Sequence, residues 1–199
     1  MNFTAYSKTT GEILYSGTAD DPSVLEDAET AIMTDEALGH GWVGQSGEHN
    51  AIPEQPSPFH SWDWGSKTWV GNLQDAITAK KLAVTEKANT LCKLPIGLNG
   101  VLFSADDTAR VRLLGTVARF NRGAGLPALW EGWLDASGAA HWANDSQAAV
   151  RLQIEALSEA IEVRDSAIVK QQKEYYDAID QLTTIQAVID FDISSGWPE

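Results

Sequence analysis

Cysteine, basic residues and long apolar runs are all scarce in this sequence of 199 residues. Cys92 is the single cysteine, which excludes an intrachain disulfide and a cluster of thiolate metal ligands. Its apolar neighbours predict a small core residue rather than a nucleophile. Fourteen Lys and Arg stand against 28 Asp and Glu, for a net charge of -14. Because phosphate groups and anionic lipids attract clustered basic residues, we expect no nucleic-acid partner and no docking on a membrane surface.

Apolar segments are too short to cross a membrane. No run approaches the roughly 20 residues that span a bilayer, and residues 1–6 lack the basic and apolar regions of a signal peptide. We therefore expect no membrane insertion and a protein that is made and folded in a cytoplasm.

Motifs of known catalytic sites are missing as well. The four histidines share no metal-ligand spacing, and neither a nucleophile elbow nor a phosphate-binding loop occurs. Paired carboxylates can hydrolyse glycosidic bonds, and the sequence holds three such pairs: Asp20 with Asp21, Asp106 with Asp107, and Asp190 with Asp192. The first two pairs stand where a helix is expected to begin, and negative charge stabilises a helix N-terminus without any catalytic role. The sequence therefore predicts no catalytic residue, no cofactor and no metal site.

The first 50 residues have the pattern of strands and turns of a small antiparallel β domain. Alternating apolar residues bounded by turn residues predict three strands, at residues 3–7, 12–17 and 30–34. Gly11 suits the first turn. Pro22 suits the first position of a helix because it lacks an N–H group, and this helix is expected to extend to about residue 29. A glycine-rich stretch at 39–47 follows.

Residues 51–70 are expected to form a linker and a hairpin. Residues 51–58 hold three of the seven prolines and predict an extended, polyproline-like linker. Residues 59–70 predict a tryptophan-rich hairpin that turns at Gly65 and Ser66. Tryptophan is enriched in binding hot spots, so three residues of this hairpin are candidates for contact with a partner: Trp62, Trp64 and Trp69. Packing inside the hairpin is the alternative explanation.

Residues 71–199 are expected to form a mainly helical domain. Apolar residues recur with helical spacing over 72–92 and 105–122, and a hairpin at 129–142 follows. Ser104 with Asp107 resembles a capping box for the second helix. That helix also carries the only local concentration of basic residues: Arg110, Arg112, Arg119 and Arg122. They are expected on a solvated face, and pairing with the acidic face of a partner is the alternative.

A long helical region is expected at residues 145–192. Residues 139–195 contain neither Gly nor Pro, and Asn144 with Gln147 predicts the start of the helix. Apolar residues then follow steps of four and three, the spacing of a coiled-coil seam. The candidate partner-binding residues of this seam are Ile154, Leu157, Ile161, Ile168, Tyr175, Leu182 and Ile189. Arg164 and Gln171 are its polar exceptions.

Two arrangements of this region remain open, one long helix or a helical hairpin. Additional apolar residues widen the stripe beyond a strict seam, so the region can also pack on its own chain. The two shorter helices cover much of the stripe only if the region folds back or if they line up end to end along it.

Two segments resemble proteins of tailed bacteriophages. PSPFHSWDWGSKTWV at residues 56–70 resembles a hairpin of tail-fibre and tail-fibre-assembly proteins, with its P-x-P, W-D and K-x-W-V elements. GVLFSADDTARVRLLG at residues 100–115 is similar to a family of phage tail proteins of unassigned function, in which a D-x-x-x-R helix precedes a hairpin and a terminal helical region. The hairpin at 130–142 and ISSGWP at 193–198 fit that pattern. The resemblance covers residues 50–198 and carries no catalytic residues.

Together these patterns predict an α+β protein, with a small N-terminal antiparallel β domain and a mainly helical C-terminal half that contains a β-hairpin and a long coiled-coil-like helix. The resemblance implies a non-enzymatic virion component or fibre-assembly chaperone at the tail fibre or baseplate. It would be located in the virion tail and, during assembly, in the host cytoplasm. Its partners would be other tail proteins. The seam adds the expectation of a homo-oligomer, for which the resemblance favours a trimer. The alternative is a carbohydrate-binding or cell-wall-degrading module, motivated by the tryptophans and paired acids.

Overall fold

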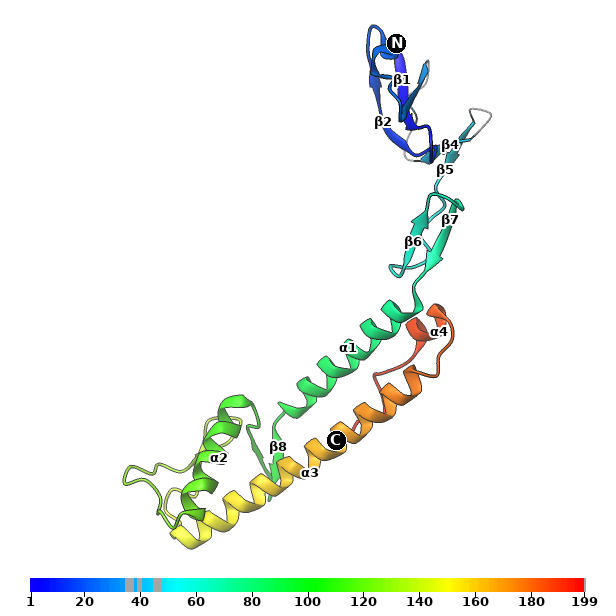
Figure 1. Ribbon diagram of the computed structural model, residues 1–199. Helices are drawn as coiled ribbons and strands as arrows, with labels where there is room; N and C mark the ends of the chain where they lie inside the picture. Colours follow the sequence, from blue (N-terminus) through cyan, green and yellow to red (C-terminus); the bar gives the residue numbers. More distant parts are fainter. Residues whose placement is uncertain (35–37, 39–40, 45–47, 199) are drawn as a thin grey trace. The chain divides into compact units, whose positions relative to one another are not determined.

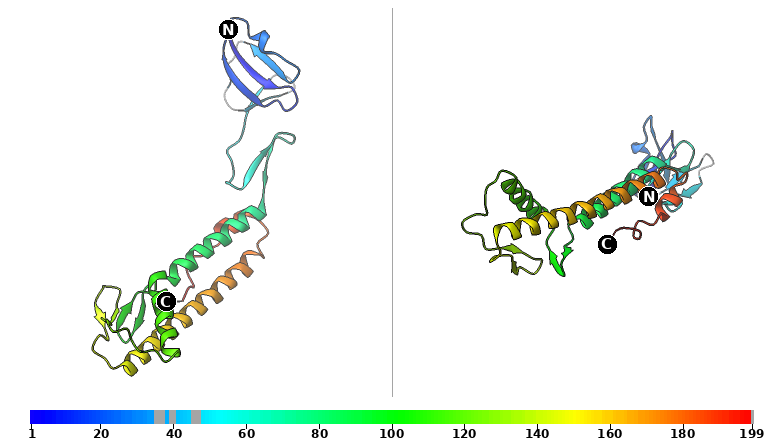
Figure 2. Two further views of the ribbon diagram at one scale, coloured as in Figure 1. Left: turned by 60° about the vertical axis from the view of Figure 1, so that its left-hand side comes forward. Right: turned by 90° about the horizontal axis from the view of Figure 1, so that it is seen from below.

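The structure is a computed structural model that describes residues 1–34, 38, 41–44 and 48–198. It divides into two compact units, Met1–Asn72 (unit 1) and Leu73–Glu199 (unit 2). Antiparallel strands build unit 1, and helices dominate unit 2 (Figures 1 and 2). The predicted α+β fold class is confirmed.

Unit 1 begins with a three-stranded antiparallel sheet in the order β2-β1-β3. Its strands are β1 (Asn2–Ser7), β2 (Ile13–Thr18) and β3 (Thr30–Thr34). Gly11 lies in the turn between β1 and β2 with a φ of 72°, a conformation that favours glycine. Phe3, Thr4 and Ala5 are buried because β1 is the central strand.

The helix expected from Pro22 to about residue 29 is shorter than predicted. A single 3-10 turn, η1, spans Pro22–Leu25, and the Asp21 side chain accepts a hydrogen bond from the Ser23 N–H at its start. The chain then turns because the Asp27 carboxylate accepts hydrogen bonds from the N–H groups of Glu29 and Thr30, at 2.8 and 2.7 Å.

Two hairpins complete unit 1. The first joins β4 (Gly41–Val43) to β5 (His49–Ala51), two strands that were not predicted within or after the glycine-rich stretch. Residues 39, 40 and 45–47 of that stretch lie outside the described residues. The second hairpin, β6 (His60–Asp63) with β7 (Thr68–Gly71), is the predicted tryptophan-rich hairpin.

Unit 2 contains the two shorter helices where they were predicted, α1 (Leu73–Cys92) and α2 (Asp107–Asn121). The capping box of Ser104 with Asp107 is wrong. Asp106 is the N-cap of α2 instead, and its Oδ1 accepts a hydrogen bond from the Ala109 N–H at 2.8 Å.

Two small hairpins flank α2 in the sequence. The hairpin of β8 (Ile96–Leu98) and β9 (Val101–Phe103) was not predicted; it turns through Asn99 and Gly100, whose φ angles are 52° and 81°. The predicted hairpin at 129–142 is present, with short strands β10 (Trp133–Leu134) and β11 (Ala140–His141).

The long helical region contains a break. Helix α3 spans Gln147–Ile179, and Ser146 rather than Asn144 caps its N-terminus. Helix α4 spans Ile185–Asp190 and begins at Thr184, whose hydroxyl accepts a hydrogen bond from the Ala187 N–H. The expected region at 145–192 is therefore a long helix followed by a short separate one.

Helices α1 and α2 follow one another along α3 (Figures 1 and 2). The first half of α3 packs with α2 and the hairpins in a core that includes Phe103, Leu113, Phe120 and Trp133. The second half runs alongside α1, where Lys81 forms an ion pair with Asp180 at 2.6 Å. This is the end-to-end arrangement that allows the shorter helices to cover the stripe.

Candidate functional site

The seam of α3 is covered by unit 2 itself. Five of the seven candidate seam residues are buried: Ile154, Leu157, Ile161, Ile168 and Tyr175. A second chain was expected because the apolar stripe lacked an evident cover within its own chain. Over α3, unit 2 itself covers the stripe, so a second chain is not needed there. These five side chains lie inside the unit and offer no surface to a partner.

The other two seam residues follow the break after α3. Leu182 is half-buried and Ile189 is exposed, whereas Val188 takes the buried position in α4. The turn at residues 180–184 resets the helical phase, so the spacing of four and three no longer selects the buried side.

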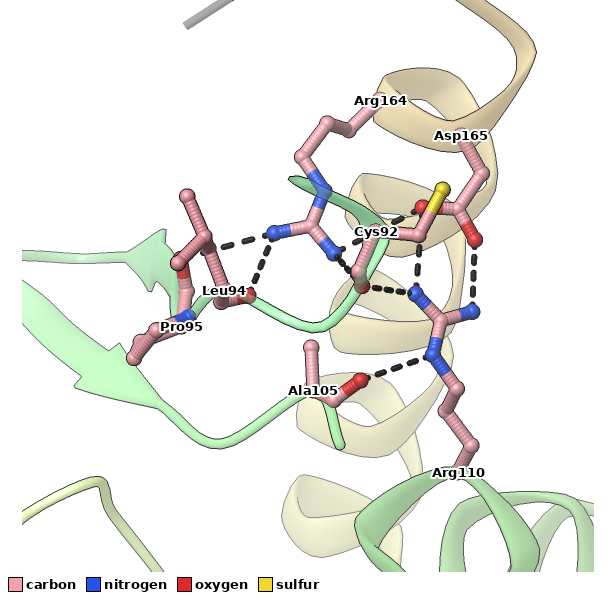
Figure 3. Close-up of polar contacts among 7 residues, drawn as sticks. All are labelled: Cys92, Leu94, Pro95, Ala105, Arg110, Arg164 and Asp165. Atoms are coloured by element: carbon pink, nitrogen blue, oxygen red, sulfur yellow. Dashed lines mark hydrogen bonds and ion pairs between the residues drawn. The ribbon is translucent and has the colours of Figure 1, made fainter. Parts of the chain in front are cut away.

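Arg164, a polar exception in the seam, caps the end of α1. Its guanidinium donates hydrogen bonds to the carbonyl oxygens of Cys92 and Leu94, each at 2.6 Å (Figure 3). Carbonyl groups at a helix C-terminus lack N–H partners within the helix, and positive charge stabilises them. Arg164 is only 9% exposed, so its seam position is used for a contact within the unit.

Arg110 reaches the same place from α2. Its guanidinium pairs with Asp165 at 2.5 Å and donates to the carbonyl oxygens of Cys92 and Ala105 (Figure 3). Cys92, Arg110, Arg164 and Asp165, which we call the arginine cluster, thus join the end of α1, the start of α2 and the middle of α3. Sequence reasoning placed Arg110 on a solvated face; that is wrong, because the side chain is used within the unit.

Cys92 lies in this cluster as a half-buried thiol. Burial raises the pKa of the Cys92 thiol, and the neighbouring Asp165 carboxylate raises this pKa further. A thiol with a raised pKa is a poor nucleophile, so its surroundings favour a packing role.

Asp135 and His141 form the other close pair of titratable side chains. His141 Nε2 donates to the Asp135 carboxylate at 2.9 Å, and the same carboxylate accepts hydrogen bonds from Ser137 and Ala139. The Ser137 hydroxyl and His141 hold the pKa of Asp135 well below its usual range. The Ser137 hydroxyl donates to Asp135 and not to His141, so the group closes the β10–β11 turn and does not form an activated serine.

Four tryptophans of unit 1 pack on one another. The Trp62 ring lies 5.2 Å from Trp42, 6.1 Å from Trp64 and 5.4 Å from Trp69 between ring centroids. The Lys67 ammonium lies 5.0 Å from the centre of the Trp64 ring, a cation–π contact. We call Trp42, Trp62, Trp64 and Trp69 the tryptophan cluster. Packing within and between the hairpins accounts for it.

The nearest carboxylate to these rings in sequence, Asp63, has a local role. It accepts hydrogen bonds from the N–H and hydroxyl groups of Ser66, at 2.7 and 3.1 Å, and these bonds lower its pKa. Asp63 therefore holds the turn of the β6–β7 hairpin.

Apolar side chains outside the seam are exposed on both flanks of α3. One groove of about 590 Å³ lies between α2 and α3, and its apolar lining includes Leu113, Leu114 and Val169. A second groove of about 790 Å³ is lined by the β8 region and the opposite flank of α3, including Leu94 and Val163. Leu114, Val163 and Val169 are each exposed by more than half. These grooves are the candidate partner-binding surfaces of unit 2.

Sequence reasoning missed both the arginine cluster and the grooves. The polar residue Arg164 within an apolar seam was a signal for the first, but its carbonyl partners lie some seventy residues earlier in the chain. The grooves depend on which apolar residues remain exposed after packing, and a spacing pattern does not contain that information.

In the part of the chain that the structure describes, no group of three or more His, Cys, Asp or Glu side chains is placed to hold a metal ion. None of the described helices is long and apolar enough to span a membrane. A comparison with known proteins finds no matching family model, no matching curated protein and no matching solved structure.

Proposed function

We propose that this protein is a non-enzymatic bacteriophage tail protein that acts at the tail fibre or baseplate through contacts with other proteins. One observation carries the protein-binding part of the proposal. Unit 2 buries its own seam and still exposes large apolar side chains in grooves on both flanks of α3. Apolar side chains that line a concave surface are a feature of binding sites.

The tail assignment rests on the resemblance of residues 56–70 and 100–115 to tail proteins. In this structure the residues of those motifs shape local structure: Trp62 pairs with Trp69 across the hairpin, Asp63 holds its turn, and Asp106 caps α2. Residues with such local roles support a fold in common with the tail proteins that the motifs resemble. The location in the phage tail is what we propose.

The non-enzymatic assignment is supported by the roles of the polar clusters. Arg110, Arg164 and Asp165 join three helices, and Asp135 with His141 closes a turn. The hydrogen bonds and ion pairs that these groups form are made with their own chain, which favours structural use over catalysis.

A carbohydrate-binding or wall-degrading module is the less favoured function. Sugar-binding tryptophans present a ring face to the ligand, whereas Trp62 contacts three other indole rings. We expect no signal on a glycan array and no clearing in a cell-wall zymogram. Binding that is lost in Trp64→Ala, or clearing of the wall substrate, would reverse this preference.

Mass spectrometry of purified phage particles and of infected-cell lysate tests the tail assignment. Presence in particles at a stoichiometric copy number identifies a virion component. Presence only in lysate, together with a tail-fibre protein on co-purification, identifies an assembly factor. Absence from both particles and tail-protein complexes would contradict the proposal.

Homo-oligomerisation belongs to the same proposal, with a trimer as the state that the resemblance favours. The buried seam of α3 does not supply its interface, so the exposed grooves or unit 1 would have to do so. Light scattering of the full chain measures the state directly, and a monomer at all concentrations would remove this part of the proposal.

A further inference from the structure

Helix α2 has apolar residues on two opposite sides. Its inner side contributes Leu113 and Phe120 to the core. Its other side carries residues spaced three or four apart, which therefore lie on one face. We call this the outer face of α2, and its members are Val111, Leu114, Gly115 and Ala118, all exposed. Val111 is 72% exposed and Leu114 is 66% exposed. A helix that is apolar on both sides is typical of one that is buried on both sides.

Gly115 lies at the centre of the outer face. Glycine destabilises the interior of a helix relative to alanine, and a Cβ atom at this position would meet no other atom within 4 Å. Nothing within unit 2 thus requires glycine here. A missing side chain permits another backbone to approach closely, which a helix lying across this face would do.

Basic residues border the outer face without carboxylate partners. Arg112 donates to the Gly132 carbonyl at 2.8 Å, and Arg119 donates to the Gly125 carbonyl at 2.9 Å. Arg122 is exposed at the C-terminal end of the helix. Among the ion pairs formed by the described residues, none includes any of these three arginines. Arg112 also lies over the Trp130 and Trp133 rings, 5.7 and 4.6 Å from their centres. Within the described residues, the positive charges of Arg119 and Arg122 are therefore the ones left for a partner.

The carboxylates at the other end of α2 are already in use. Asp106 caps the helix, and Asp107 pairs with Lys93 at 2.8 Å. Asp135, which lies near Arg112 in a shallow surface pocket, is held by the β10–β11 turn. The outer face is therefore an apolar strip with a basic border, in a chain whose net charge is -14.

We propose that the outer face of α2 binds an acidic amphipathic helix of another protein. Apolar side chains of that helix would cover Val111 and Leu114, and its flanking carboxylates would meet Arg119 and Arg122. Charge complementarity favours this occupant, because Arg119 and Arg122 have no carboxylate partner among the described residues. A second copy is an outcome that the test below distinguishes. The proposal rests on the proposed function as a protein-binding tail component, and it specifies the chemistry of the partner.

Isothermal titration calorimetry of the full chain tests this pairing with two synthetic peptides of about 18 residues, long enough for a helix-in-groove contact. One has leucine along one helical face and glutamate on its flanks; the other has lysine in place of every glutamate. We expect the acidic peptide to bind, with an affinity that falls as salt is added, and the basic peptide not to bind. Val111→Ser with Leu114→Ser should weaken binding about tenfold or more. Arg122→Glu should weaken it as well.

Matched controls on α3 separate a specific surface from general stickiness. Leu152 is 67% exposed, about the same as Leu114 at 66%, and Lys170 is exposed like Arg122. Leu152→Ser and Lys170→Glu should leave the affinity unchanged, and circular dichroism confirms that every variant is folded.

Several results would overturn the proposal. They are no binding of the acidic peptide, equal binding of both peptides, or equal losses in the controls. If the Val111 and Leu114 variant instead dissociates an oligomer of the full chain in light scattering, the occupant is a second copy and the proposal is wrong. Absence of the chain from phage particles would refute the tail assignment and leave the peptide result standing, so the two failures are distinguishable.

Discussion

Unit 1 and unit 2 differ in how their buried side chains are arranged. In unit 1 the buried residues are few and lie on short strands and turns, among them Phe3, Ala5 and Val43. In unit 2 a row of buried side chains follows α3 from Val150 to Ile179. Unit 1 adds the tryptophan cluster, whose rings are only half-buried.

The difference shows two ways of stabilising a small unit. A helical core buries a side chain at nearly every turn, so most of its residues are closely packed by their neighbours. Short strands present too little area for that, and large aromatic side chains supply contact area at fewer positions. Substitutions should therefore cost most along α3 and less in the tryptophan cluster.

The largest effect is expected at Ile154, which is fully buried between α3 and the hairpins. Ile154→Ala should lower the free energy of unfolding by about 4 kcal/mol, because it leaves a cavity in the core. Leu152→Ala, on the exposed side of the same helix, should change it by about 0.5 kcal/mol or less. Urea denaturation followed by far-UV circular dichroism measures both, and equal effects would mean that α3 does not form the core of unit 2.

Arg164 tests whether a polar side chain supports the same core. Arg164→Met should cost about 3 kcal/mol, because the Leu94 carbonyl loses its charged donor and the Cys92 carbonyl keeps only Arg110. Arg151→Met breaks an exposed pair with Glu155 and should cost about 0.5 kcal/mol. The same denaturation experiment applies. A variant at 164 as stable as the one at 151 would show that the arginine cluster contributes little.

Trp62 is the corresponding test in unit 1. Trp62→Ala removes three aromatic contacts from a half-buried site and should destabilise unit 1 by about 2 kcal/mol. Backbone amide NMR spectra should show losses confined to residues of unit 1. Trp64→Ala removes a single ring contact and serves as the milder control. Loss of signals from α3 would mean that the two units do not unfold independently.

Gly115→Ala should raise the free energy of unfolding, in contrast to the substitutions above. The new methyl group meets no neighbouring atom, so the helix should gain about 1 kcal/mol of stability from the better helix former. Thermal denaturation measures the gain. Gly100→Ala is the contrasting control, since its φ of 81° disfavours alanine although no atom lies within 4 Å. If Gly115→Ala instead destabilises the protein, Gly115 must pack against another part of unit 2, and the outer face of α2 is not open as described.

The smallest effect at neutral pH concerns Asp135. Hydrogen bonds from Ser137 and His141 lower the pKa of Asp135 in the folded state, so its stabilising contribution is present above the ordinary carboxyl pKa of about 4. The contribution is lost as the pH falls through the lower folded-state pKa. Melting temperatures measured from neutral to acid pH should therefore converge for wild type and Asp135→Asn. A constant difference at every pH would mean that Asp135 does not remain ionised in the fold.

Sequence patterns predicted the secondary-structure elements better than they predicted the contacts between those elements. The spacing of apolar residues located α1, α2 and α3, because helical periodicity is a local property. It did not show that α1 and α2 would cover α3, since that depends on how the connections between the helices fold. The Asn99–Gly100 pair is a strong hairpin signal that could have located β8 and β9.

The candidate site was less predictable than the fold. Ile154, Leu157 and Ile161 were expected to contact a partner, and they lie in the core. Val111 and Leu114 had the same apolar character and lie outside it. Composition and spacing do not distinguish the two groups. Only the packed structure shows which apolar side of each helix is already covered.

Lys80, near the start of α1, donates hydrogen bonds to the carbonyl oxygens of Ile189 and Phe191, across 109 and 111 residues. Contacts between such distant positions slow folding, because a long loop must close before they form. During synthesis, α1 leaves the ribosome well before α3 and α4. The side of α1 that packs on these two helices therefore stays uncovered until they have been made. Unit 2 can therefore complete its fold only after almost all of its residues have been translated, and until then its apolar face is open to chaperones.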